Sequence, residues 1–180
     1  IKRTVREYIH LKTGMEFVLI PGGSFMMGSN SGRGNEKPVH RVTLSPYLIS
    51  KTEVTQAVWE KIMGKNPSQF KGDHRPVEKV SWQDCVRFCK KTGLQLPTEA
   101  QWEYAAKAGH DDHRYAGGNV IDTFAWHQNN SNKTTHPVGQ KKPNDFGLYD
   151  MSGNVWEWCQ DWYGDYPSLS VTDPVGPPSG

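Results

Sequence analysis

Gly147-Leu148-Tyr149-Asp150-Met151-Ser152-Gly153-Asn154-Val155-Trp156-Glu157-Trp158 carries more structural information than any other part of the chain. It places two carboxylates, Asp150 and Glu157, on either side of a Gly-Asn turn, and two Trp rings flank the second acid. One interpretation is a strand over 155–158 whose Trp side chains fill the core while the acids face water. The other is a loop that holds a hard cation such as Ca²⁺, which takes carboxylate and backbone oxygens together. The residues of this segment are compatible with both.

The composition is typical of one loop-rich domain stabilised by aromatic side chains. Of the 180 residues 35% are hydrophobic, with 18 Gly and 12 Pro, and seven Trp, seven Tyr and six Phe supply large apolar area. The length suffices for one core, and no repeat or linker divides it. The net charge is +2 with Lys and Arg scattered along the chain, so we expect no nucleic-acid partner. No apolar run approaches the ~20 residues that span a bilayer, so we expect no membrane partner.

Three segments have the pattern of a helix: 55–63, 81–91 and 98–109. Ser81 and Thr98 are the residue types that cap helix N-termini, and Gln101 completes a capping box with Thr98. These two capped segments are the expected main helices, and no long helix is expected after Gly109. Short apolar or alternating runs predict strands at 17–20, 25–28, 39–44, 47–49, around 138 and at 155–158. The Pro-Gly turn at 21–22 predicts that the first two strands return on each other.

Cysteine and histidine residues offer two further candidate groups. The chain has three cysteines, Cys85, Cys89 and Cys159. Because this number is odd, at least one thiol is unpaired within the chain. Cys85 and Cys89 lie one helical turn apart and could share a face, although two small buried residues have the same spacing. No Cys-x-x-Cys pair occurs, so we expect no structural zinc site built from cysteines. The segment His110-Asp111-Asp112-His113 is interpreted as a solvated loop; the alternative is a metal site, which requires convergent ligands and not only adjacent ones.

Five phrases occur in a fixed order: 17–28, 80–82, 96–106, 146–149 and 153–158. Together they resemble the formylglycine-generating enzyme family, also called sulfatase-modifying factors. The resemblance spans residues 16–180, which leaves 1–15 as an N-terminal extension. It implies a variant of the C-type lectin-like fold: an α+β, loop-rich domain with short antiparallel strands and two main helices. Glu53, in Thr-Glu-Val-Thr, lies in a family phrase and is expected to be a buried acid that ties a strand to a helix.

The resemblance also favours the cation interpretation of the opening segment. In the family, a structural Ca²⁺ is held by a side chain just after Leu-Tyr, two carbonyls of the Gly-Asn turn and the Glu between the Trp residues. The matching positions are Asp150, Gly153, Val155 and Glu157. Two charges and two neutral oxygens, completed by water, agree with the ~6–8 oxygens that Ca²⁺ takes. A second Ca²⁺ site of the eukaryotic enzyme is not carried over, because the corresponding region departs from its pattern.

The family's reaction oxidises a cysteine in a sulfatase Cys-x-Pro-x-Arg motif to formylglycine, using oxygen and copper bound by two thiolates. Those cysteines follow a Gly-Pro-Pro-Ser-Gly phrase, which here ends at Gly180, and the three cysteines of this chain do not match them. No catalytic residue is therefore named. We expect the C-terminal part of the domain to be missing, and we expect copper only if that segment carries the cysteine pair.

Two hypotheses of different class remain. The first is an oxygen- and copper-dependent oxidoreductase of the formylglycine-generating type, seen without its catalytic segment. The second is a non-catalytic ligand-binding domain on a C-type lectin-like scaffold, such as a retroelement-diversified variable protein. Both predict a peptide or protein as substrate or ligand, and the short segment over 55–80 resembles bacterial relatives. The fold does not choose between them, because one scaffold hosts both functions.

Overall fold

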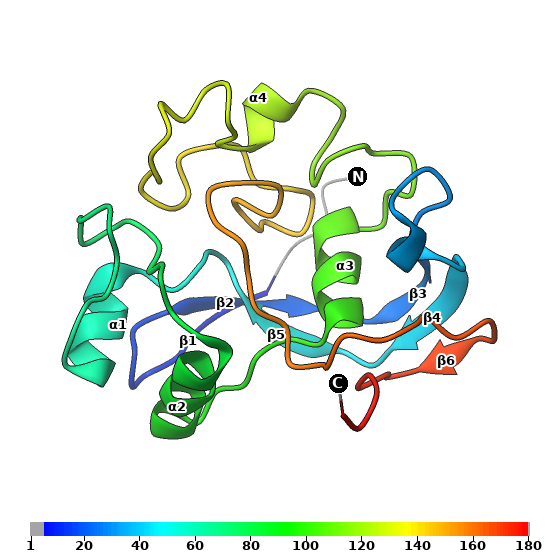
Figure 1. The fold of residues 1–180 in the computed structure, drawn as a ribbon, viewed down its shortest axis with the longest axis horizontal. Coiled ribbons are helices and arrows are strands. Elements are labelled where there is room, and N and C mark those ends of the chain that lie inside the picture. The colour runs from blue at the N-terminus through cyan, green and yellow to red at the C-terminus, as the bar shows by residue number, and fades with distance from the viewer. Residues whose placement is uncertain (1–5, 180) are drawn as a thin grey trace.

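The computed structural model describes residues 6–179, which form an α+β domain with short strands and long connecting loops (Figure 1). One sheet has the order β1-β2-β5, with β1 at Glu7–Ile9, β2 at Glu16–Ile20 and β5 at Tyr47–Ser50. The second sheet has the order β3-β4-β6, with β3 at Gly23–Met27, β4 at His40–Leu44 and β6 at Val171–Thr172. All pairs are antiparallel except β4 with β6. The first five residues of the expected N-terminal extension lie outside the described part of the chain.

The predicted return of the second strand onto the first is wrong. Strands β2 and β3 are consecutive in the chain but belong to different sheets. Gly22 has a φ of +74°, and a Cβ there would lie 2.5 Å from the carbonyl oxygen of Leu44. The turn therefore packs against the end of β4 and directs the chain into the second sheet.

The three predicted helices are confirmed, two of them with the expected caps, Ser81 and Thr98, and the third with Thr55 as its cap. Helix α1 covers Gln56–Met63, α2 covers Trp82–Thr92 and α3 covers Glu99–Lys107. Thr55, Ser81 and Thr98 each accept a hydrogen bond from a backbone amide in the first turn, which satisfies a donor that has no partner within the helix. Helix α3 ends at Ala108, one residue before the predicted Gly109. A 3₁₀ turn lies at Gly34–Glu36, before β4. After α3 the described residues contain one further helical turn, α4, at Ile121–Phe124.

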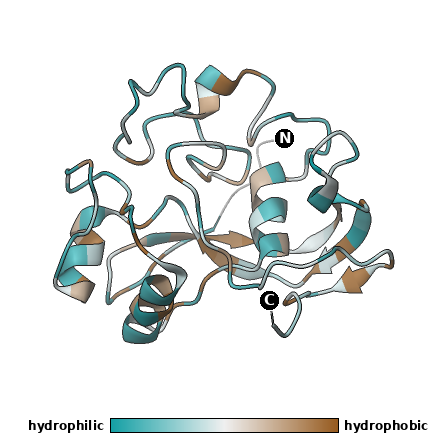
Figure 2. Cartoon of the chain, in the orientation of Figure 1, coloured by the Kyte–Doolittle hydropathy of each residue, from teal (hydrophilic) through white to brown (hydrophobic). Residues whose placement is uncertain are grey.

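The core lies between the sheets and α3. Val18, Ile20 and Val42 have no exposed surface, and Ala105 of α3 packs against the same cluster. Figure 2 shows apolar colour concentrated along the central strands, while the long loops are mostly polar. Helices α1 and α2 lie together at one end of the domain (Figure 1), where the rings of Trp59 and Phe88 stack with centroids 5.2 Å apart.

The strands expected around 138 and at 155–158 are absent from the described residues, which have irregular backbone there. The Trp side chains of the second segment do not fill the core, since Trp156 is 96% exposed and Trp158 is 50% exposed. Indole and amide donors hold this segment instead: Trp158 Nε1 donates to the Val80 carbonyl and the Gln160 amide donates to the Pro97 carbonyl. Over residues 6–179, the structure contains no helix with the length and apolar character needed to cross a bilayer.

Candidate cation site and apolar cavity

The Gly-Asn turn is fixed by close backbone packing. Asp150 and Asn154 both have left-handed backbone conformations, with φ of +59° and +61°. The Asn154 amide donates to the Trp126 carbonyl at 2.8 Å. A Cβ on Gly153 would lie 2.2 Å from that same carbonyl oxygen, so only glycine allows this approach. The Asn154 side chain accepts from the His136 amide and donates to the His136 carbonyl, which uses both ends of its amide group.

Asp150 is buried, and one of its two carboxylate oxygens has no hydrogen-bond partner among the described residues. Its side chain is 2% exposed, and its Oδ2 accepts a hydrogen bond from the Gly139 amide at 2.7 Å. Its Oδ1 is also buried but has no hydrogen-bond partner among the described residues. Burial raises the pKa of this carboxyl above its usual value. Buried polar atoms normally have a partner, so the free oxygen calls for one.

Glu53, which lies between β5 and α1, joins the same group of acids. Both of its carboxylate oxygens are buried without a hydrogen-bond partner in the described part of the chain. Burial raises its pKa well above the usual value, and the charges of Asp150 and Glu157 raise it further. The sequence predicted that Glu53 is buried but did not place it at the site. The only local signal is that Glu53 lies in the segment that connects a strand to a helix. Its position near Asp150 depends on tertiary packing, which no local pattern shows.

Glu157 is the third acid and borders open space. Its Oε2 accepts a 3.0 Å hydrogen bond from Nε1 of Trp102 in α3. Removal from water by the surrounding protein atoms raises the pKa of Glu157 to about 7. The charge of Asp150 also raises this pKa, whereas the hydrogen bond from Trp102 lowers it. Glu157 remains reachable by water because it lines a cavity. One of its oxygens is thus held in place while the carboxylate as a whole faces the other two acids.

Three carboxylates from two segments of the chain therefore lie close enough for their charges to interact. Their mutual repulsion and their three unpartnered buried oxygens are the environment in which a hard divalent cation stabilises a fold. Asp150 and Glu157 would supply carboxylate oxygens, and the turn between them carries the carbonyls of Gly153 and Val155. The donor chemistry fits Ca²⁺, and the ligand set inferred from the resemblance stays a prediction. Glu53 is a further acid that this prediction did not include.

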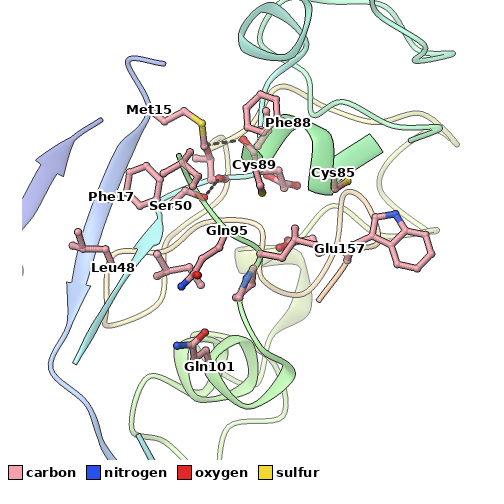
Figure 3. Close-up of a pocket in the computed structure, with 18 of the residues that line it drawn as sticks. Met15, Phe17, Leu48, Ser50, Cys85, Phe88, Cys89, Gln95, Gln101 and Glu157 are labelled. Atoms are coloured by element: carbon pink, nitrogen blue, oxygen red, sulfur yellow. Dashed lines mark hydrogen bonds between the residues drawn. The ribbon is translucent and has the colours of Figure 1, made fainter. Parts of the chain in front are cut away.

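An apolar cavity of about 580 Å³ adjoins the acid cluster. Strands β2 and β5, helix α2 and the segment 149–158 contribute its walls. Figure 3 shows Phe17 and Leu48 from the strands, Phe88 from α2 and Glu157 around the same space. Leu48 is 50% exposed, so the cavity is open to solvent at β5. β5 is the end strand of its sheet and lines the cavity over its whole length.

The three cysteines are free thiols. Cys85 and Cys89 share a face of α2, as one of the two interpretations of their spacing predicted, and both line the cavity. Burial raises the pKa of Cys85 to about 11 and that of Cys159 to about 12, and nearby negative charges add to both shifts. Burial also raises the pKa of Cys89. These surroundings favour protonated thiols over the thiolates that bind Cu(I).

Comparisons with known proteins agree with this architecture. Residues 4–176 match the family model described as the sulfatase-modifying factor enzyme 1-like domain. The chain is 36% identical to a chaperone protein, LppX, of Paenibacillus barcinonensis, over 82% of this chain and 72% of that protein. It is 30% identical to the formylglycine-generating enzyme of Streptomyces coelicolor, over 91% of this chain and 74% of the enzyme. The solved structure of Treponema denticola variable protein 1 superposes with a TM-score of 0.85 at 33% identity, covering 99% of this chain and 84% of that one. By its core, its Gly-Asn turn and these relatives, the chain belongs to the sulfatase-modifying factor enzyme 1-like family.

Proposed function

We propose that this domain is a protein-binding module that takes an apolar, extended polypeptide segment of a partner into the cavity between β5 and α2. The observation that carries the proposal is the open apolar cavity of about 580 Å³. Its volume lies in the range of roughly 300–1,000 Å³ that is typical of binding sites, and most of its lining is aliphatic or aromatic. Such a surface is stabilised when an apolar partner displaces water from it.

The edge of β5 suits an extended segment. Within residues 6–179, β5 pairs with β2 alone, and no strand pairs with its other edge. Addition of a strand to a sheet edge supplies backbone hydrogen bonds, and pockets beside the strand select its side chains. Trp156 and Trp158 stand at the rim of the cavity and offer the large aromatic surfaces that dominate many protein interfaces.

The acid cluster has a supporting role in this proposal. A Ca²⁺ bound by Asp150 and Glu157 with the turn carbonyls would neutralise their repulsion, and Glu53 would face the same ion. When bound, the ion supplies charge neutralisation and fixed geometry, because Ca²⁺ has no redox chemistry at such a site. The turn carries Trp156 on its far side, so its rigidity would set the position of the aromatic rim.

The relatives support a binding role without excluding a second candidate. One relative is named a chaperone protein and another a variable protein, and a role in handling other proteins agrees with an open apolar cavity. The second candidate is copper-dependent oxidation of a sulfatase cysteine, which the identity to the Streptomyces enzyme favours. The three cysteines of this chain do not match the positions of the family's copper-binding pair, so the oxidase would need a cysteine pair that residues 6–179 do not supply.

Binding to a permanently unfolded protein tests the proposal. Fluorescently labelled, reduced and carboxymethylated lactalbumin is titrated with the domain in Ca²⁺, and anisotropy is measured. We expect saturable binding that Leu48→Asp and Trp156→Ala each weaken about 10-fold, since each change removes aromatic or aliphatic contact worth more than 1 kcal/mol. Leu169→Ala is the control, because Leu169 is 77% exposed and lies outside the cavity. No binding, or equal binding by all four proteins, would contradict the proposal.

A second assay tests whether this chain by itself oxidises a sulfatase-type cysteine. A Cys-x-Pro-x-Arg peptide is incubated with the domain, Cu(I) and oxygen, and its mass is followed. We expect the peptide to keep its mass. Conversion of its thiol to an aldehyde above the rate without protein would establish the oxidase instead.

A further inference from the structure

We propose that His110, Asp112 and His113 form a binding site for a divalent transition metal of the zinc class, separate from the acid cluster. Each of the three residues offers one ligand atom, and these atoms all lie within 4.8 Å of one another. The imidazole rings of His110 and His113 stack with centroids 4.1 Å apart and an angle of 15° between their planes. The fold therefore brings the ligand atoms of these three residues together, which their adjacency in the sequence alone would not do.

The backbone after α3 produces this convergence. Ala108 and Gly109 both adopt left-handed conformations, with φ of +49° and +84°. The His110 amide then donates to the Lys107 carbonyl at 2.9 Å, which closes a tight turn at the end of the helix. The C-terminal end of a helix carries partial negative charge, so a cation is favoured beside it.

Two hydrogen-bonding features point to a missing ligand. Nδ1 of His113 is buried and has no hydrogen-bond partner among the described residues, a state that is costly for a ring nitrogen. Nε2 of His110 lies 2.8 Å from Oδ2 of Asp145. An ionised carboxylate only accepts, so Nε2 carries the proton of this bond, and the neutral ring then has its lone pair on Nδ1. At zinc sites, a metal-binding histidine often donates its other ring N–H to a carboxylate, which fixes the orientation of the ring.

The donor set selects the class of metal. Two imidazole nitrogens and one carboxylate oxygen suit Zn²⁺ and its neighbours, with water as the fourth ligand, whereas Ca²⁺ and Mg²⁺ prefer oxygen alone. The acid cluster around Asp150 offers only oxygen ligands from its side chains. The two sites are therefore distinguishable by the metal that each takes.

Titration with Zn²⁺ alone tests the proposal on the whole chain. Calorimetry is performed with saturating Ca²⁺ present, so that the acid cluster does not compete for Zn²⁺. We expect one Zn²⁺ per chain, loss of measurable binding in His110→Ala and His113→Ala, and about 10-fold weaker binding in Asp145→Asn, which removes the charge that orients His110. His74→Ala is the matched control, because His74 is an exposed histidine outside the cluster, and it should bind as the unchanged protein does.

Co²⁺ provides an independent readout. Visible absorption of the Co²⁺-loaded protein should show the bands of a low-coordinate nitrogen and oxygen site, and His113→Ala should lose them. Circular dichroism of each variant checks that loss of binding does not reflect loss of the fold. Zn²⁺ affinity that is unchanged in His113→Ala, or no Zn²⁺ binding by the unchanged protein, would overturn the proposal.

Discussion

Nε1 of Trp102 donates a 3.0 Å hydrogen bond to Oε2 of Glu157, and this bond joins helix α3 to the segment that carries the candidate cation site. Trp102 belongs to the capped helix and Glu157 to the irregular segment between two exposed Trp residues. The bond holds one carboxylate oxygen in place while the acid still faces Asp150 and Glu53. The position of Glu157 is thus set before any cation binds.

Glu157→Gln should lower thermal stability in Ca²⁺ but not in a chelator, where it removes a carboxylate whose ionisation is unfavourable in the fold. Gln keeps an oxygen that can accept from Trp102 but removes the charge that a cation requires. We expect the melting temperature in Ca²⁺ to fall by roughly 2–4 °C for each kcal/mol of lost binding free energy. Differential scanning calorimetry with Ca²⁺ and with chelator measures both values. Equal losses under the two conditions would show that Glu157 has no part in cation binding.

Glu53→Gln should have opposite effects with and without Ca²⁺. In chelator, removal of a buried, unpartnered charge is expected to stabilise the fold by about 1–3 kcal/mol. In Ca²⁺, the same change should weaken binding of the ion, which isothermal titration measures directly. Glu60→Gln is the control, because Glu60 is exposed on α1. Destabilisation of Glu53→Gln in chelator would indicate that Glu53 has a partner other than a cation.

Stability without Ca²⁺ should fall as pH rises. Burial raises the pKa of Glu157 from 4.5 to about 7, so the folded state retains a proton that the unfolded chain releases near pH 4.5. The folded state therefore loses stability between about pH 4.5 and about pH 7, and the raised pKa values of Glu53 and Asp150 act in the same direction. Bound Ca²⁺ should reduce this loss, because it favours the charged carboxylates. Urea unfolding in chelator at several pH values checks the slope; a rise in stability over this interval would contradict it.

Gly153→Ala should be strongly destabilising. The added Cβ would lie 2.2 Å from the Trp126 carbonyl oxygen, and a backbone atom cannot move aside as a flexible side chain can. We expect a loss of about 2–4 kcal/mol in the free energy of unfolding, with weaker Ca²⁺ binding because the turn is displaced. Gly34→Ala is the control, since nothing lies within 4 Å of its added Cβ. Chemical denaturation of both variants measures the difference, and equal stabilities would show that the turn can relax.

Local signals in the sequence predicted the helices well. Ser81 and Thr98 are caps whose side-chain hydrogen bonds are made within three residues, so short-range pattern is enough to find them. The strands over 39–44 and 47–49 are confirmed for a similar reason, because the first has alternating apolar residues and the second is a short apolar run. The error at Gly22 arose from contacts with the distant β4, which no local pattern contains.

The candidate site was predicted only in part, because its completion is tertiary. Asp150 and Glu157 could be named from one segment and from the family resemblance. Glu53 could not, because it lies about one hundred residues earlier in the chain and meets the other acids through packing. Val and Trp favour strands, so the sequence predicts a strand over 155–158. Hydrogen bonds from Trp158 to Val80 and from Gln160 to Pro97 hold the segment in irregular form instead.

Hydrogen–deuterium exchange of the domain in Ca²⁺, with and without reduced and carboxymethylated lactalbumin, tests the binding proposal most directly. An apolar segment seated beside β5 would protect backbone amides at the cavity wall. We predict slower exchange in β5, in α2 and over 149–158, with no change in the loop at 110–114 on the other side of α3. Protection confined to regions outside the cavity, or no protection at saturating lactalbumin, would contradict the proposed function.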